Sequence, residues 1–189
     1  MIPACIFRDK EHLKEISNLP GYYKWWAAQS ELDVILKALN IQFSDIENAL
    51  EIKDGLYCIY VGIAVKESVR ARLDWHVNDK HTATQVLNGT LSTLRQSISS
   101  IVTGNQFDKT ATDSFIDKLY VEYFYCDEAI RSETAKHKLH ETEKKLLAEY
   151  LRVLNIQENH HPLSTPIKTG LKELRKQSKS FNTTIGGSL

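Results

Sequence analysis

The chain has 189 residues, a mass of 21.6 kDa and as many basic as acidic residues, so it carries no formal net charge. This length can bury a core without disulfides, and no apolar run approaches the roughly 20 residues that cross a membrane, which excludes a membrane protein. The neutral charge is unlike the strongly basic balance of a general nucleic-acid coat protein.

The first half of the chain predicts helices around two strands. Asp9 can cap a first helix, which ends before the aromatic run at residues 22–26, and that run favours a strand. Ser30 can begin a second helix with one apolar face, and a short helix is expected after Ser44. Residues 55–62 are β-branched and aromatic and bounded by glycines, so they predict a central strand.

The second half predicts three helices and one more strand. Helical spacing of apolar residues covers 67–77 and a segment that begins near residue 90. Residues 119–126 alternate as a third strand, and 132–154 form one long helix. The order of these elements predicts an α/β or α+β fold with a small mixed three-stranded sheet flanked by helices.

Neither internal repeats nor low-complexity blocks divide the chain. We therefore expect one domain over residues 1–178, with a helical insertion at about 27–53 and a flexible tail at 179–189. The amino terminus has neither the basic start nor the continuous apolar core of a secretion signal. We expect the protein in the cytoplasm.

A carboxylate interrupts the apolar stripe of the long helix. That stripe consists of Leu139, Leu146, Leu147, Tyr150 and Leu154. Glu143 falls within it, and burial of an unpaired charge costs several kcal/mol. Glu143 should therefore meet a cation, a metal ion or several hydrogen-bond donors. A structural salt bridge, or a stripe edge that reaches water, is the alternative.

Arg72 and His76 are one helical turn apart and share a face with Val69 and Leu73. An arginine there offers a fixed fork of donors suited to a phosphate, and a histidine can move a proton near neutral pH. A buried histidine beside an arginine that reaches the surface would explain the same pattern without any chemistry. The pair alone does not decide between the two interpretations.

The motifs, taken in order along the chain, resemble those of the GIY-YIG endonuclease family. Residues 21–23 (Gly-Tyr-Tyr) stand where the family has Gly-Ile-Tyr, and residues 60–62 (Tyr-Val-Gly) where it has Tyr-Ile-Gly. Residues 68–76 look like the next motif, and 143–147 are similar to the family's metal-binding glutamate followed by two apolar residues. The resemblance covers residues 20 to about 164, and it implies a GIY-YIG-like fold.

Three departures from the family pattern bear on the assignment. A helical insertion separates Tyr23 from Tyr60, as in some restriction endonucleases of the family, whereas the two tyrosine motifs are usually close. Residues 55–57 (Gly-Leu-Tyr) are a rival first motif, but they nearly abut Tyr60 and leave no room for a turn. The closing asparagine is open, because Ser164 stands where asparagine is common and Asn159 is only a candidate.

The resemblance implies a metal-dependent DNA endonuclease with five catalytic residues. Glu143 would hold Mg²⁺ or Mn²⁺, and Arg72 would bind a phosphate oxygen. Tyr23 would act as the base for the attacking water, with His76 accepting or orienting that proton. Tyr60 would position the water or the phosphate.

The sequence says less about the binding partners and the biological role of the protein. Arg70, Arg95, Lys168 and Lys172 are candidate phosphate contacts, although solvated surface charge is the commoner fate of such residues. Cleavage of both DNA strands would favour a homodimer. A stand-alone enzyme of the restriction type is the favoured interpretation. The alternative is a non-catalytic module on the same fold that binds nucleic acid or a protein.

Overall fold

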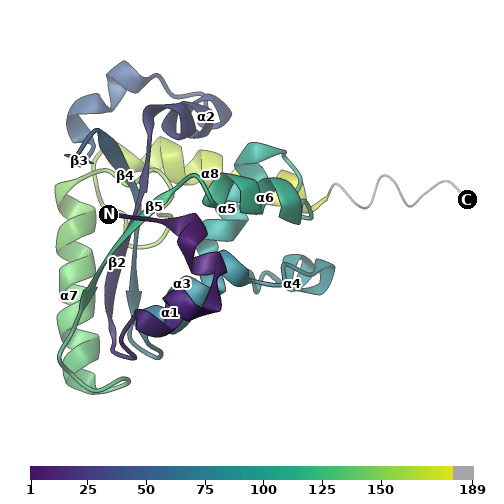
Figure 1. Cartoon of the computed structure of the whole chain (residues 1–189). Coiled ribbons are helices and arrows are strands. Elements are labelled where there is room, and N and C mark those ends of the chain that lie inside the picture. The colour runs from purple at the N-terminus through teal and green to yellow at the C-terminus, as the bar shows by residue number, and fades with distance from the viewer. Residues whose placement is uncertain (181–189) are drawn as a thin grey trace, which may run out of the picture.

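One antiparallel sheet organises the chain, as the computed structural model of residues 1–180 shows (Figure 1). Its strands follow the order β1-β5-β2-β4-β3, and every neighbouring pair is antiparallel. The strands are β1 (Ile2–Pro3), β2 (Gly21–Ala27), β3 (Ile52–Lys53), β4 (Leu56–Ala64) and β5 (Tyr120–Tyr125).

The predicted α/β class is confirmed, but the prediction of a mixed three-stranded sheet is wrong. The three predicted strands correspond to β2, β4 and β5, and β1 and β3 add one short strand at each edge. Two residues are too few for the alternation that reveals a strand in a sequence. The central strand is β2, which pairs with both β4 and β5, and not the predicted segment 55–62.

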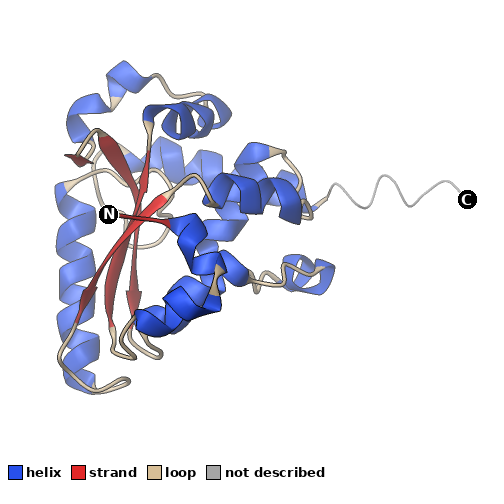
Figure 2. Cartoon of the chain, in the orientation of Figure 1, coloured by secondary structure: helices blue, strands red, loops and turns tan. Residues whose placement is uncertain are grey.

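Helices cover both faces of this sheet (Figure 2). Helix α7 packs on β4 and β2, and α3 contacts the same two strands. The α-helices are α1 (Lys10–Glu15), α2 (Gln29–Leu39), α3 (Val69–Asn78), α4 (Ala83–Asn88), α5 (Thr93–Val102), α6 (Lys109–Ile116), α7 (Glu133–Glu149) and α8 (Ser164–Lys179). Short 3-10 turns lie at Ala4–Arg8, Phe43–Asp45 and Glu47–Ala49.

The predicted helices correspond to α1, α2, α3, α5 and α7, with differences at their ends. Asp9 caps α1 as expected. Helix α2 begins after Ala28 without a side-chain cap and not at Ser30, and the short helix expected after Ser44 is a pair of 3-10 turns. Helices α4, α6 and α8 lie outside the predicted set.

Helix α7 ends at Glu149, before its predicted end at Leu154, because the edge of β4 needs hydrogen-bond partners. Strand β3 pairs with only the first two residues of β4. Beyond them the Leu154 amide donates to the Ile59 carbonyl over 2.9 Å. The Asn155 side chain accepts from the Val61 amide and donates to the Val61 carbonyl, over 2.9 and 2.8 Å. Extended chain after α7 thus completes the sheet edge.

A β-bulge in β4 decides which face of the sheet Tyr60 occupies. Trp25 pairs with Tyr60 and Trp26 with Cys58, so Ile59 is an extra residue on β4. Side chains two positions apart on a regular strand share a face. Here Cys58 packs in the small cluster beneath α7, whereas Tyr60 packs in the larger core on the opposite face. The bulge therefore turns Tyr60 toward α3.

A buried ion cluster joins the segment before β4 to the segment after α7. The Glu51 carboxylate accepts from Lys24 Nζ at 2.6 Å and from Arg152 Nη2 at 2.5 Å. Arg152 has no exposed surface, and its Nε and Nη1 lack partners among the described residues. Glu51 is therefore the carboxylate that balances a fully buried guanidinium.

Replacement of Glu51 by alanine is expected to lower the free energy of unfolding by about 3 kcal/mol or more. Loss of one partner leaves Arg152 buried and unpaired, which is the costly way to break such a pair. Chemical denaturation checks this, with Glu47→Ala as the control because Glu47 is exposed and such changes cost within about 0.5 kcal/mol. Equal losses in the two variants would contradict the expectation.

The predicted insertion at about 27–53 holds α2 and two 3-10 turns, and the strands on either side of it pair directly. The single domain over 1–178 stays a prediction. The predicted tail, 179–189, lies outside the described residues apart from residues 179 and 180. Among residues 1–180, none of the helices combines the length and the apolar character needed to span a membrane.

Candidate active site

A buried tyrosine–histidine pair links the central strand to α3. Ser68 caps α3 and thereby sets which residues of the helix face the sheet. The Tyr23 hydroxyl lies 2.8 Å from His76 Nε2, and both side chains are about 1% exposed. Four aromatic rings lie with centroids 5.3 to 6.1 Å from the His76 ring, namely Tyr23, Trp25, Tyr60 and Trp75.

Two glycines of the tyrosine motifs make room for this packing. Tyr23 pairs across the strands with Gly62, and a Cβ on Gly62 would lie 2.4 Å from the Tyr23 hydroxyl oxygen. A Cβ on Gly21 would lie 2.0 Å from the Phe124 carbonyl oxygen. Both distances are far below van der Waals contact, so any larger residue would displace the tyrosine or the neighbouring strand.

Burial keeps both members of the pair uncharged. It raises the pKa of Tyr23 well above its ordinary value, and Tyr60 adds to this effect. It lowers the pKa of His76 well below its ordinary value, with further lowering by the charges of Arg72 and Arg95. At neutral pH, His76 is therefore a neutral imidazole that can accept a proton at Nε2.

Two neighbours hold the half-buried side chain of Arg72 in place. Its Nη1 lies 3.0 Å from Glu67 Oε1, and its guanidinium carbon lies 4.7 Å from the centroid of the Trp75 ring. Its Nε is buried and has no partner among residues 1–180. Arg72 therefore retains donors for an anion while Trp75 fixes the plane of the fork.

The charge of Arg72 acts on every other residue of the predicted catalytic set. Burial is the main cause that raises the pKa of Tyr23, Tyr60 and Glu143, and Arg72 opposes it at each of them. At His76 the Arg72 charge acts in the same direction as burial. The five residues therefore form one electrostatic unit.

Glu143 projects from α7 with its side chain 16% exposed. Its nearest basic group is His140 Nδ1, 3.9 Å from Oε2, which is too long for a hydrogen bond. Burial raises the pKa of Glu143 to about 7, with a further contribution from Glu158 and opposition from Arg72. A cation, a metal ion or several donors at this carboxylate stay a prediction, because among the described residues the one basic group within 4 Å is His140.

A cavity of about 330 Å³ opens beside Glu143. Its lining includes Tyr60, Thr93, His140, Glu143, Asn155 and Glu158. Tyr23 and His76 are not part of this lining, but their rings lie next to Tyr60, with centroids 6.5 and 6.1 Å from that of Tyr60. Of the five predicted catalytic residues, Tyr60 and Glu143 therefore line the cavity, Tyr23 and His76 form the buried pair next to Tyr60, and Arg72 lies outside the lining.

The residues around the cavity fit a metal ion that takes one ligand from the protein and others from the substrate. Within residues 1–180, no group of three or more histidine, cysteine, aspartate or glutamate side chains could enclose a metal ion. A hard divalent cation can bind a single carboxylate and take the rest of its shell from water and phosphate oxygens. The unpaired Glu143 carboxylate suits that arrangement.

Comparison with known protein families shows whether the chain shares its sequence pattern with one of them. A family model described as the GIY-YIG catalytic domain matches residues 21–177. The chain belongs to the GIY-YIG family. Endonuclease activity is what this family implies in general, and its nucleases generally depend on a metal ion. No curated protein and no solved structure matches this GIY-YIG domain.

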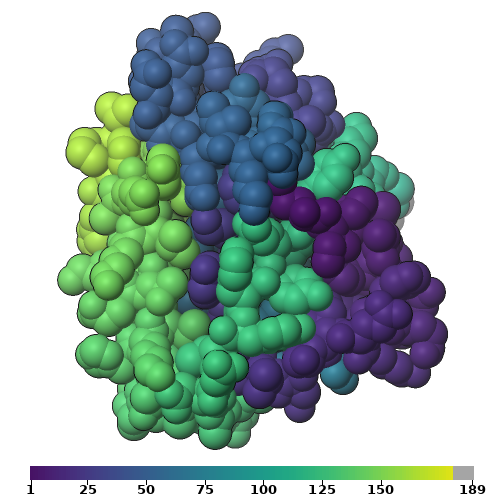
Figure 3. All heavy atoms as spheres, turned by 60° about the vertical axis from the view of Figure 1, so that its left-hand side comes forward, coloured from purple at the N-terminus to yellow at the C-terminus, as the bar shows by residue number. Residues whose placement is uncertain are grey.

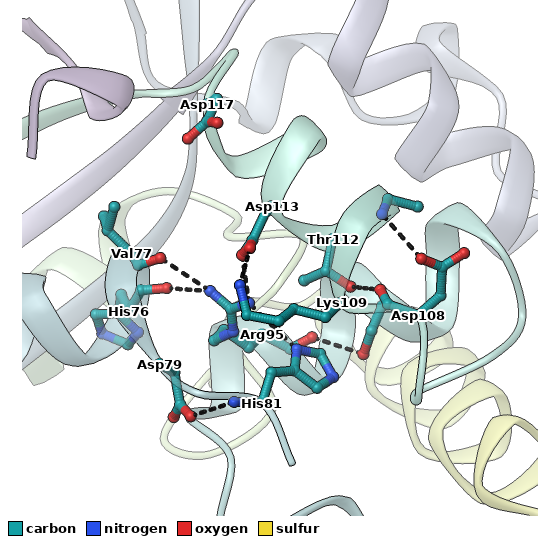
Figure 4. A network of polar contacts seen from close by, with 12 residues as sticks. His76, Val77, Asp79, His81, Arg95, Asp108, Lys109, Thr112, Asp113 and Asp117 are labelled. Carbon is teal, nitrogen blue, oxygen red and sulfur yellow. Dashed lines mark hydrogen bonds and ion pairs between the residues drawn. The ribbon is translucent and has the colours of Figure 1, made fainter. Parts of the chain in front are cut away.

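One predicted phosphate contact of the GIY-YIG domain is wrong. Arg95 has no exposed surface. Its Nη1 donates to the carbonyls of His76 and Val77 over 2.8 and 3.2 Å, and its Nη2 bonds Asp113 and His81 (Figure 4). Arg95 on α5 therefore holds the end of α3 and cannot reach DNA from this position.

The other predicted contacts lie nearer the surface. Arg70 is half-buried and its Nε donates to the Ile16 carbonyl over 2.6 Å. Lys168 is half-buried and donates to the Asn159 carbonyl over 2.8 Å, whereas Lys172 is exposed on α8. Contact of these three residues with DNA stays a prediction.

Sequence reasoning missed Asn155, the asparagine that lines the cavity. Asn159, the candidate chosen from the sequence, is 1% exposed and donates to the carbonyls of Arg152 and Asn155. The available signal was the position of Asn155 directly after Val153 and Leu154, which the prediction of a helix up to Leu154 absorbed.

Arg175 on α8 supports the cavity wall from behind. Its Nη2 donates to the Thr93 carbonyl and to Ser97 Oγ, both over 2.6 Å. Burial lowers the pKa of Arg175 to about 10, while Tyr60 acts in the opposite direction. The family match reaches residue 177 and so includes this part of α8.

Proposed function

We propose that the protein is a metal-dependent endonuclease that hydrolyses phosphodiester bonds in DNA. The observation that carries this proposal is geometric: the Tyr23 hydroxyl lies 2.8 Å from His76 Nε2, and Tyr60, whose ring lies next to both of theirs, lines one cavity with the Glu143 carboxylate. The Arg72 guanidinium, the half-buried Glu143 carboxylate and an uncharged tyrosine–histidine pair are together suited to a phosphate group under attack by water.

Glu143 is the residue that would hold Mg²⁺ or Mn²⁺. When bound, such an ion stabilises the leaving oxygen and the charge that develops on the phosphoryl group. Arg72 supplies donors for a nonbridging phosphate oxygen. The Asn155 side chain keeps the Val61 backbone, and hence the neighbouring Tyr60, in place at the cavity wall.

The proton of the attacking water requires an acceptor, and Tyr23 with His76 provides one. As the water oxygen bonds to phosphorus and the ester bond breaks, Tyr23 takes the proton and passes its own to His76 Nε2, 2.8 Å away. A tyrosine with a raised pKa can act as a base only with such a partner. Tyr60 lines the cavity, and its ring centroid lies 6.5 Å from that of Tyr23.

The proposal also covers the oligomeric state, the DNA contacts and the location of the enzyme. A stand-alone enzyme of the restriction type would cut both strands, which calls for two copies related by a two-fold axis. The phosphate contacts Arg70, Lys168 and Lys172 belong to this proposal, as does a cytoplasmic location. A module that binds DNA without cutting it is the outcome to be excluded.

Substitution of Tyr23 by phenylalanine tests the proton path. Loss of the hydroxyl is expected to lower the cleavage rate by about 10² to 10⁴-fold, the usual contribution of a general base. Tyr22→Phe is the matched control, since its half-buried ring stacks on Phe124 with centroids 4.6 Å apart and is not part of the His76 pair. A Tyr23→Phe enzyme that cuts plasmid at the wild-type rate would refute the assigned role.

A further inference from the structure

We propose that Lys66, Arg131 and Lys136 form a phosphate-binding track that holds the DNA strand beside the bond that is cut. This inference rests on the proposed nuclease function and names the surface that binds its substrate. None of these three residues was a candidate from the sequence. All three side chains are exposed.

The track lies on the same side of α7 as the proposed metal ligand. Spacings of three, four and three residues separate Glu133, Lys136, His140 and Glu143, so these residues share one face of the helix. At 1.5 Å per residue, Lys136 lies about 10 Å from Glu143 along the axis. Figure 3 shows α7, in light green, as a ridge on the surface.

The three cations of the track line a hollow that adjoins the catalytic cavity. Its volume is about 320 Å³, and its lining comprises Val65, Lys66, Arg131, Glu133, Lys136 and His140. His140 also lines the cavity beside Glu143, so the two depressions adjoin at this residue. A strand whose phosphate lies at Glu143 would therefore continue past His140 into a hollow that carries three cations.

Two loops are tied together to place these cations. The Arg131 amide donates to the Val65 carbonyl over 2.9 Å, and Arg131 Nε donates to the Lys66 carbonyl over 3.0 Å. Arg131 adopts a left-handed backbone with φ of 64°, which is uncommon for a residue other than glycine. The loop between β4 and α3 is thus fixed to the loop between β5 and α7.

The charge in the hollow is available to a phosphate. The one acid in its lining is Glu133, whose side chain is 88% exposed and lies 3.3 Å from Lys136 Nζ. An exposed pair of this kind contributes little, so a phosphate can replace it.

DNA binding at several salt concentrations tests the track. The background is the full chain with Glu143→Gln, which keeps the probe, a fluorescently labelled duplex, intact. Lys66→Gln with Lys136→Gln is expected to weaken binding between about 10-fold and 60-fold at 0.1 M salt, and to reduce the slope of log Kd against log salt by about 1.8. Lys37→Gln with Lys118→Gln removes the same charge from exposed positions that line neither the hollow nor the catalytic cavity, and should change neither quantity.

The outcomes separate this inference from the function on which it rests. Unchanged affinity and slope in the Lys66/Lys136 variant, with wild-type protein still nicking plasmid, would overturn the track alone. Absence of both DNA binding and nicking by folded wild-type protein would overturn the proposed function and the track together. A loss of affinity that is equal in the control pair would also overturn the track, since net charge would then explain it.

Discussion

Replacement of Glu143 by glutamine is expected to lower the rate of DNA cleavage by about 10³-fold or more. Glutamine keeps the shape of the side chain but removes the negative charge that would hold the cation. A factor of 10³ corresponds to about 4 kcal/mol of transition-state stabilisation, which is within what a catalytic metal ion supplies. Single-turnover cleavage of a labelled duplex measures it, with Glu149→Gln, exposed at the end of the same helix, as the control.

The same variant should be more stable than the wild type at high pH. The pKa of Glu143 is about 7 in the folded protein against an ordinary value of 4.5. Between these values the unfolded chain loses the proton while the folded protein retains it, so wild-type stability falls as pH rises through this window. Glutamine does not titrate and avoids that loss.

The expected gain for Glu143→Gln is about 1 to 2 kcal/mol at pH 8 after allowance for partial solvent exposure. It should vanish near pH 4.5. Thermal unfolding across this pH range, without divalent ions, makes the comparison, and Glu149→Gln should show no such trend. A Glu143→Gln protein that is less stable than the wild type at pH 8 would show that the carboxylate makes a stabilising contact, and the metal assignment would lose its basis.

Replacement of Asp113 by asparagine is expected to cost about 3 to 5 kcal/mol, because it leaves the buried Arg95 charge without its counter-ion. Asp113 Oδ1 lies 2.5 Å from Arg95 Nη2, and Arg8 and Lys109 contact the same carboxylate. Burial alone would raise the pKa of Asp113, but the hydrogen bonds from Lys109 and Arg95 outweigh it and lower the pKa. At this chain length the melting temperature should fall by about 6 to 20 °C.

A nearby aspartate serves as the control for Asp113. Asp117 pairs with Arg8 Nε at 2.8 Å, but its side chain is 37% exposed, so Asp117→Asn should cost less than about 1 kcal/mol. Figure 4 shows how the network around Arg95 reaches the backbone of His76. Similar losses for the two aspartates would contradict the view that Arg95 holds the catalytic end of α3.

The places of the candidate residues on their helices could be predicted from the sequence. Periodicity shows that Arg72 and His76 are one turn apart and that Glu143 interrupts an apolar stripe, but the roles of these residues come from the family resemblance and stay predictions. The family match spans residues 21–177 and so includes all three of these residues. Periodicity cannot show whether a charged side chain is buried, because exposed and buried charges have the same sequence signature. Arg95 was assigned to the surface for this reason.

Features that depend on long-range pairing could not be predicted. The bulge at Ile59 reverses the face of Tyr60, yet one extra residue in a strand leaves no mark in the sequence. Helix α8 contains Pro166 near its start and Gly170 inside it, residues that usually argue against a helix. The structure tolerates Pro166 in the first turn, and Gly170 lets α8 approach Leu39 closely.

The most direct test of the account is cleavage of supercoiled plasmid by the wild-type protein with Mg²⁺ or Mn²⁺, with EDTA, and by the Glu143→Gln variant with either metal. The account predicts nicked or linear product with the metal ions alone, none with EDTA and none from the variant. Metal-independent cutting, or cutting by Glu143→Gln at the wild-type rate, would contradict the claim that Glu143 holds the ion required for DNA hydrolysis.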